Sequence, residues 1–122
     1  MKPGVRFHIR DRIDGSEPAI GPGKIALLEA IGSTGSITAA AKMLGMSYRR
    51  AWLLVDETNR CLVEAAVRTA AGGKRGGGTA LTHAGADLVK RYRAVERETS
   101  SAVTRKLRSM LRDVRRRHRA EK

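Results

Sequence analysis

The chain contains a single cysteine, Cys61, so no disulfide can form within it. A lone cysteine is typical of a reducing compartment, and we expect a cytoplasmic protein. Cys61 lies in the apolar-periodic run LVDETNRCLV, which favours a small buried hydrophobic residue over a reactive thiol.

Long apolar runs are also missing. No run of about 18 apolar residues, the length that a membrane-spanning helix requires, occurs in the sequence. The N-terminal stretch MKPGVRFHIRDRI alternates charged and apolar residues, whereas a secretory signal needs a continuous apolar core. We therefore expect no membrane partner.

Acidic and aromatic residues are scarce. The 122 residues include 12 Asp and Glu and 25 Lys and Arg, which gives a net charge of +13. Only 3% of the residues are aromatic. A chain of this length predicts one domain. A field of this sign attracts polyanions, nucleic acid first and anionic membrane second. The alternative is a soluble protein with a basic tail.

The N-terminal third predicts a strand and then a helix. A period of two predicts a half-buried strand whose inner residues are Val5, Phe7, Ile9 and Ile13. The segment DGSEPAIGPG supplies turn residues, and its last Pro and Gly can open a helix. KIALLEAIGSTG has helical apolar spacing and ends at Gly32 or Gly35.

Two more helices follow with a short corner between them. The Ser36 hydroxyl is placed to cap the first of them, whose three consecutive alanines allow another helix to cross at close range. Gly45 ends it. Ser47 can cap a longer helix that continues to about Leu62.

The segment AAVRTAAGGKRGGGTALT predicts a hairpin around a five-glycine tip that carries Lys74 and Arg75. Thr82 can cap a last, long amphipathic helix. Apolar residues at steps of three and four on that helix predict a surface for pairing with a second copy, formed by Leu88, Tyr92, Val95, Val103 and Leu107.

Helix, tight corner, helix and hairpin in this order predict a mainly α, winged helix-turn-helix fold. We expect an N-terminal strand, the hairpin as the wing, and the long C-terminal helix for dimerisation. The predicted domain covers residues 1–112, and residues 113–122 form a basic tail that frays.

The start of the second helix of the corner carries the predicted chemistry. Residues at the N-terminal end of such a helix reach base edges in the major groove, and Arg49 and Arg50 can pair with guanine or clamp a phosphate. The alternative is a solvated helix end. Trp52 and Tyr48 can pack in the core or press on the sugar–phosphate backbone. The predicted DNA-binding residues are Ser47, Tyr48, Arg49, Arg50, Trp52, Lys74 and Arg75.

Catalysis and metal binding find no support. The three histidines, His8, His83 and His118, lie on different elements without zinc-ligand spacing to the cysteine. The glycine-rich tip is no phosphate-binding P-loop, because Arg68 stands where its first glycine belongs and Arg75 where Ser or Thr belongs. We expect no enzyme, no cofactor and no metal site.

The motifs GSITAAAKMLGMSYRRAW and GGKRGGGTALTHAGADL together resemble the N-terminal DNA-binding domain of ModE-type molybdate-responsive transcriptional regulators. The resemblance covers roughly Val5 to Leu111. It implies a winged-helix homodimer whose long last helix, with the first strand, supplies the interface. It also implies regulation of genes for molybdate uptake and molybdoenzyme function, and a DNA-binding role for the residues named above.

The sequence also departs from that family. Such regulators continue into paired molybdate-binding domains, and this chain stops before them, so we expect a stand-alone domain that does not bind molybdate. Arg75 replaces a glycine of the usual wing. The expected function is a sequence-specific regulator that binds double-stranded DNA. The alternatives are a sequence-independent, nucleoid-type DNA-binding protein, a protein-interaction module and a direct molybdate binder.

Overall fold

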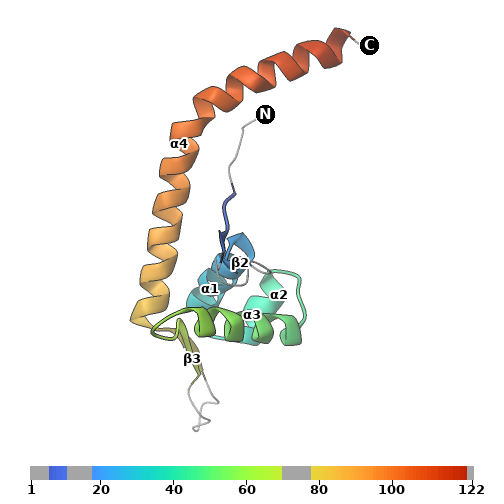
Figure 1. Ribbon diagram of the computed structural model, residues 1–122. Coiled ribbons are helices and arrows are strands. Elements are labelled where there is room, and N and C mark those ends of the chain that lie inside the picture. Colours follow the sequence, from blue (N-terminus) through green and yellow to red (C-terminus); the bar gives the residue numbers. More distant parts are fainter. Residues whose placement is uncertain (1–5, 11–17, 70–77, 121–122) are drawn as a thin grey trace.

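Three short helices and two hairpins are packed at one end of a long helix (Figure 1). The computed structural model describes residues 6–10, 18–69 and 78–120. The elements are, in order, β1 (Ile9–Arg10), β2 (Pro18–Ile20), α1 (Pro22–Thr34), α2 (Ile37–Met43), α3 (Tyr48–Cys61), β3 (Val67–Thr69), β4 (Thr79–Leu81) and α4 (His83–Ala120). The mainly α class and the helix-turn-helix with a hairpin are confirmed.

The ends of the first three helices follow their predicted punctuation. Helix α1 starts with Pro22, whose ring fixes a helical φ, and it ends at Gly35, which has a φ of 73°. Ser36 caps α2 by accepting a hydrogen bond from the backbone N–H of Ala39 at 3.1 Å. Gly45, with a φ of 68°, makes the corner that leads into α3.

The core lies where α1, α2 and α3 meet. Helices α2 and α3 contact each other, and the buried residues that they contribute to the core include the small side chains of Ala40, Ala41 and Ala51. The larger core side chains come from α1, namely Ile25, Leu27, Leu28 and Ile31. In the N-terminal part of α3 the face that carries Ala51 is buried, and the opposite face is open to solvent.

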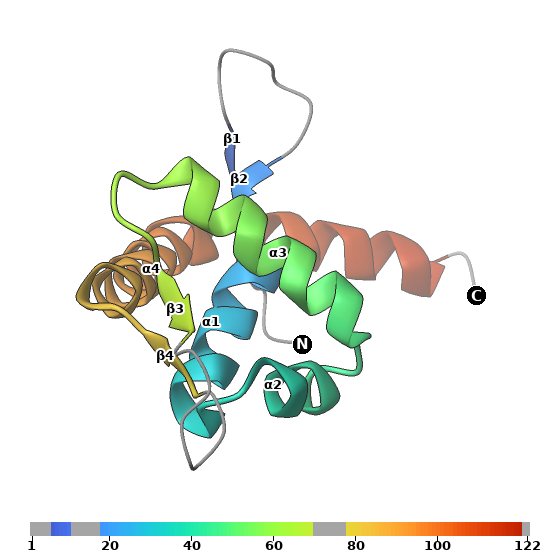
Figure 2. The same ribbon diagram turned by 90° about the horizontal axis from the view of Figure 1, so that it is seen from below.

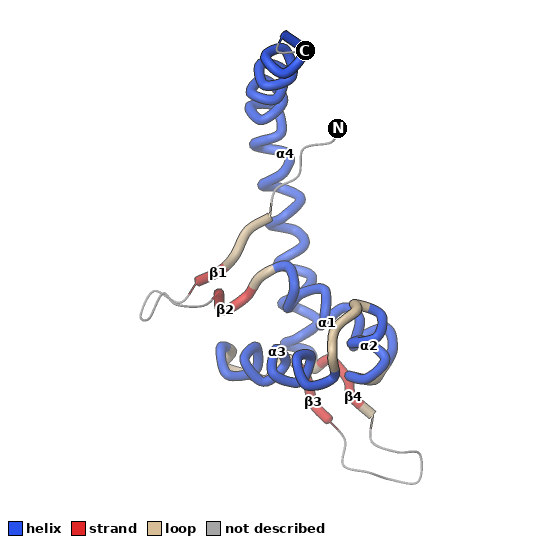
Figure 3. Tube along the Cα trace, turned by 90° about the vertical axis from the view of Figure 1, so that its right-hand side faces the viewer, coloured by secondary structure: helices blue, strands red, loops and turns tan. Residues whose placement is uncertain are grey.

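The second hairpin, β3 and β4, is antiparallel with Val67 opposite Leu81 and Thr69 opposite Thr79. Its base is tied to the helices, because the backbone N–H of Thr79 donates to the carbonyl oxygen of Gly35 at 3.0 Å. The hairpin and α3 lie at the same end of the molecule, away from the far end of α4 (Figures 1 and 3).

Helix α4 begins where the predicted cap stands. The Thr82 hydroxyl accepts from the backbone N–H of Gly85 at 3.0 Å and donates to the carbonyl oxygen of Ala65. The side chain of Arg93 then joins α4 to α1, since its Nε and Nη2 atoms donate to the two carboxylate oxygens of Glu29 and its Nη1 donates to Glu96 at 2.8 Å. These hydrogen bonds raise the pKa of Arg93.

We call the part of the molecule where α1, α2, α3 and the hairpins pack together the body. Beyond the body, α4 extends away from the other described elements and bends (Figure 1). In this half Thr104 donates a hydrogen bond to the carbonyl oxygen of Ser100, a contact that often bends helices. The helix runs through Ala120, and the predicted boundary between residues 1–112 and 113–122 stays a prediction. No helix in the described ranges combines the length and apolarity needed to cross a bilayer.

The N-terminal strand differs from its prediction. Strand β1 is only two residues long and pairs with β2, which lies inside the segment predicted as a turn. Phe7 is half-buried as expected, but Ile9 is 48% exposed. Alternation alone could not place the inner face here, because the chain leaves the body after Phe7 has stacked on α4. Val5 and Ile13 lie outside the described residues.

The prediction for Cys61 was wrong, because the structure leaves it exposed. Cys61 is the last residue of α3, and it lies off the stripe formed by Ala51, Val55 and Thr58, which are buried. The apolar residues of the sequence continue to the end of α3, but the last residue of the helix does not pack against the core. The apolar period therefore did not predict the exposure of Cys61.

Gly85 tests the close approach between α4 and the segment before β3. A Cβ atom at Gly85 would lie 2.1 Å from the carbonyl oxygen of Ala66, whereas one at Gly23 would meet nothing within 4 Å. We expect Gly85→Ala to destabilise the fold by about 2 kcal/mol or more, and Gly23→Ala to stabilise it by about 0.5–1 kcal/mol. Urea unfolding at one fixed protein concentration measures both. Equal effects of the two substitutions would contradict this packing.

Candidate nucleic-acid interface

Helix α3 starts at an exposed, capped end. The Ser47 hydroxyl accepts a hydrogen bond from the backbone N–H of Arg50 at 3.1 Å, as the sequence predicted. The cap fixes the first turn, in which Tyr48, Arg49 and Arg50 are all exposed. Figure 2 shows α3 lying across this end of the molecule with the β3–β4 hairpin beside it.

The guanidinium groups of Arg49 and Arg50 have no partner among the residues that the structure describes. Other arginines do, since Arg60 pairs with Asp56 at 2.8 Å and Arg93 with two glutamates. An unpaired positive charge in the first turn of a helix opposes the helix dipole and adds nothing to stability. The two groups are therefore available to an external anion.

The exposed surface of α3 divides into three stripes along its axis. The outermost stripe, which we call the outer ridge, consists of Arg49, Leu53, Asp56 and Arg60 at steps of four, three and four residues. One flank carries Tyr48 and Trp52, and the opposite flank carries Arg50, Leu54 and Glu57. Each stripe faces a different neighbour, so the stripes differ in what they can contact.

The Tyr48–Trp52 flank faces the hairpin. Together with Thr69 at the end of β3, Gly78 just before β4, and the first residues of α2, these two aromatic rings line a cleft of about 390 Å³. Trp52 is 48% exposed and Tyr48 56%, so neither ring is part of the buried core. An aromatic body with a polar edge suits contact with sugar and phosphate.

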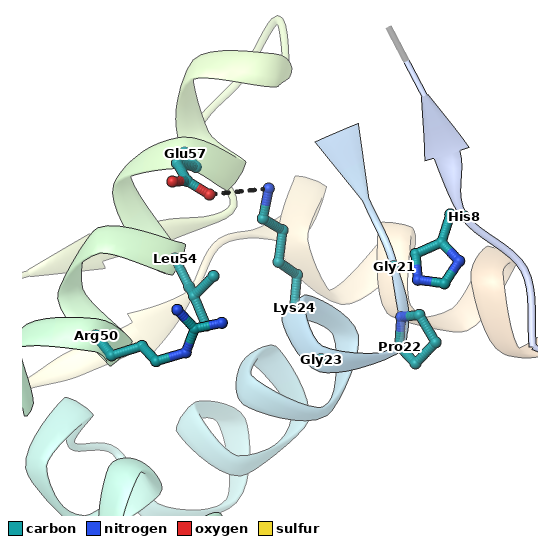
Figure 4. Close-up of a pocket in the computed structure, with 8 residues that line it drawn as sticks. All are labelled: His8, Gly21, Pro22, Gly23, Lys24, Arg50, Leu54 and Glu57. Atoms are coloured by element: carbon teal, nitrogen blue, oxygen red, sulfur yellow. Dashed lines mark ion pairs between the residues drawn. The ribbon is translucent and has the colours of Figure 1, made fainter. Parts of the chain in front are cut away.

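The other flank faces α1 and the first hairpin. Arg50, Leu54 and Glu57 line a pocket of about 340 Å³ whose far wall is His8 with the segment 21–24 (Figure 4). The ammonium group of Lys24 lies 3.2 Å from a carboxylate oxygen of Glu57, and its side chain is only 10% exposed. This ion pair links α3 to the start of α1, and the exposed Arg50 lines the same pocket.

The side-chain amide of Asn59 fixes the hairpin to the last turn of α3. Its Oδ1 accepts from the backbone N–H groups of Ala66 and Val67 at 2.8 and 3.1 Å, and its Nδ2 donates to the carbonyl oxygen of Val67 at 3.2 Å. The sequence analysis missed this residue. The feature of the sequence that could have indicated this contact is a lone Asn in the last turn of an amphipathic helix, where its side chain has no capping role.

Two predicted DNA-binding residues, Lys74 and Arg75, lie outside the described residues. The strands that carry this tip, β3 and β4, are in place beside α3. The assignment of both residues to DNA contact therefore stays a prediction.

The residues predicted for dimerisation fall into two groups. Leu88 packs against the core, and Tyr92 is 3% exposed, with its ring stacked on Phe7 at 4.2 Å and its hydroxyl donating to the carbonyl oxygen of Phe7 at 2.7 Å. Burial raises the pKa of Tyr92, and the neighbouring Glu96 acts in the same direction, so the phenol keeps the proton that it donates. Both side chains therefore pack within their own chain, and their role in dimerisation stays a prediction.

The second group lies farther along α4. Val95 is 47% exposed, Val103 and Leu107 are half-buried, and the stripe continues into the exposed Met110 and Val114. Dimerisation through these residues stays a prediction. The described residues include no group of three His, Cys, Asp or Glu side chains that could hold a metal ion.

A capped helix that crosses a second helix on alanines, with an antiparallel hairpin tied to its far end, defines a winged helix-turn-helix. In such a domain the first turn of this helix and the hairpin form one surface. We call the exposed residues of α3 and the hairpin beside it the α3–wing face.

No family model matches the chain, but comparison with individual known proteins finds similar ones. The chain is 49% identical to the molybdenum-pterin-binding protein MopB of Rhodobacter capsulatus over 63% of its length, and 46% identical to the molybdenum transport protein ModE of Azotobacter vinelandii over 71%. It is 42% identical to the DNA-binding transcriptional dual regulator ModE of Escherichia coli K12 over 58%.

Over the matched segment the chain is similar to ModE-type proteins, as its motifs indicated. The matched segment covers 28, 32 and 27% of these three relatives, so the chain spans less than a third of their length.

Removal of the Asn59 amide tests the hydrogen bonds that hold the hairpin against α3. Asn59→Ala leaves the N–H groups of the buried residues Ala66 and Val67 without an acceptor, so we expect a loss of about 2–4 kcal/mol in the free energy of unfolding. The matched control is Arg60→Ala on the next residue, whose surface ion pair predicts a change of about 0.5 kcal/mol or less. Urea unfolding and hydrogen exchange at the two amides measure the effect. Similar losses of unfolding free energy in both variants would contradict the stabilising role of the Asn59 hydrogen bonds.

Proposed function

We propose that the chain is a DNA-binding transcriptional regulator that recognises specific sequences in double-stranded DNA. The observation that carries the proposal is the capped first turn of α3, which presents to solvent two arginines that have no partner within ranges 6–10, 18–69 and 78–120. The net charge of +13 supports a polyanionic ligand. The printed names of relatives, among them the DNA-binding transcriptional dual regulator ModE, support it independently.

The two arginines take different roles in this proposal. Arg49 stands on the outer ridge, which enters the major groove first, so it pairs with a base edge, guanine by its donor geometry. Arg50 stands on the flank toward α1, beside the pocket that Lys24 and Glu57 line, and there it meets a phosphate. Tyr48 and Trp52 contact the backbone on the hairpin side, where Lys74 and Arg75 add phosphate contacts.

The same proposal extends to the assembly and to the genes. A homodimer formed along α4 presents two α3 helices to half-sites one helical turn of DNA apart, about 34 Å, or a multiple of it. The relatives named for molybdenum transport support genes of molybdenum metabolism as the targets. A cytoplasmic location follows from the ligand, and no catalytic role is proposed.

Selection of genomic fragments tests sequence specificity. Fragments bound by the chain from its own genome are enriched, sequenced and tested by gel shift against an excess of poly(dI-dC). We expect one pseudo-palindromic motif, bound at least about 10³-fold more tightly than the competitor. Equal competition by poly(dI-dC) would favour the sequence-independent alternative, and binding seen only at low salt would favour a protein-interaction module.

Three single substitutions separate base reading from phosphate contact. Arg49→Ala should cost about 1–3 kcal/mol on the selected site and relax the preference at one base pair per half-site. Arg50→Ala and Lys74→Ala should weaken all sequences equally and reduce the slope of log K against log salt by about 1 each. The control Arg91→Ala removes the same charge from α4, where Arg91 pairs with Asp87 at 3.4 Å, and should leave the preference intact.

The result that would contradict these assignments is equally clear. If Arg49→Ala and Arg91→Ala reduce affinity by the same factor and leave the base preference unchanged, the first turn of α3 does not read the sequence.

A further inference from the structure

The outer ridge of α3 is chemically divided along its length. Its second half is internally neutralised, because Arg60 pairs with Asp56 at 2.8 Å across one helical turn. Its first half consists of Arg49, which has no ionic or hydrogen-bonding partner among the described residues, and Leu53, which lies outside the core cluster that those residues form. A ligand that meets the ridge therefore meets one guanidinium group and one isobutyl group.

Leu53 contributes nothing to the core. Its neighbour Leu54 packs against the core residues, whereas Leu53 lies outside that cluster and is 44% exposed. A single exposed leucine is ordinary on a protein surface. This one stands four residues from Arg49 on the same stripe, where any good helix former would hold α3 equally well. Its position on the ridge, and not its burial, is the feature to explain.

We propose that Leu53 reads thymine through the C5-methyl group in the major groove, next to the base that Arg49 pairs with. The inference rests on the proposed function, because it assigns a specificity to the same face. Thymine is the base that carries a methyl group in the major groove, whereas cytosine presents an amino donor there. Leu53 can bury the methyl group but cannot accept from the amino group, so it favours T·A over C·G.

The spacing along the helix fixes where that thymine lies. Four residues of α-helix advance about 6 Å, and base pairs follow one another every 3.4 Å or so, which is about two steps. The thymine recognised by Leu53 is therefore expected one or two base pairs from the position that Arg49 reads.

Deoxyuridine substitution tests this contact, because it removes the methyl group and changes no hydrogen bond. Each thymine of the selected site is replaced singly by deoxyuridine, and dissociation constants are measured for the unmodified protein and for Leu53→Ala. At one thymine per half-site we expect deoxyuridine to weaken binding about three- to fivefold, the effect of one buried methyl group. Leu53→Ala should bind the unmodified site more weakly and lose the distinction at that position.

The control variant is Val63→Ala, a fully exposed apolar residue that lies off the ridge in the loop after α3. It should keep every deoxyuridine effect of the parent protein. Circular dichroism and sedimentation establish that each variant keeps its helix content and its oligomeric state.

Failure of this inference and failure of the proposed function give different results. If no sequence is selected at all, both fall. If a site is selected but Leu53→Ala retains all the deoxyuridine effects, or if the site has no thymine within two base pairs of the position lost in Arg49→Ala, only the role of Leu53 falls. A change of oligomeric state in Leu53→Ala with unchanged base preference would assign the residue to a protein contact and would overturn the inference as well.

Discussion

The side-chain amide of Asn59 is the constraint on which the geometry of the α3–wing face depends. Three hydrogen bonds from this amide hold the backbone of Ala66 and Val67 against the last turn of α3. The first turn of the same helix is held by the Ser47 cap and by the alanine contact with α2. With both ends of α3 fixed, the helix and the strands β3 and β4 can meet a rigid ligand as one surface, which lowers the cost of ordering on binding.

Neighbouring residues of α3 face different surroundings and can therefore have different roles. A helix rotates by about 100° per residue, so adjacent side chains lie on different stripes. Arg49 therefore stands on the outer ridge while Arg50 turns toward α1, and Leu53 is exposed while Leu54 packs inward. A phosphate contact, a base contact and a core contact can thus come from consecutive positions without competing for space.

Features set by neighbours in the sequence could be predicted, and those set by distant contacts could not. The caps at Ser36, Ser47 and Thr82 follow from a hydroxyl placed just before an apolar period, and all three are confirmed. The contact between Tyr92 and Phe7 spans 85 positions, and no local pattern reveals it. The Asn59 contacts span only seven and eight positions, but they depend on how the loop after α3 turns back, which apolar periodicity does not encode. The exposure of Cys61 and Ile9 depends on where the body ends, which apolar periodicity does not encode.

The most direct measurement is the change in backbone amide NMR shifts when a duplex carrying a selected site is added to the labelled protein. The account predicts that the largest changes fall in the first two turns of α3 and in β3 and β4, while α4 beyond the body changes little. Changes confined to the basic second half of α4, with residues 47–53 unaffected, would contradict the claim that the α3–wing face binds DNA.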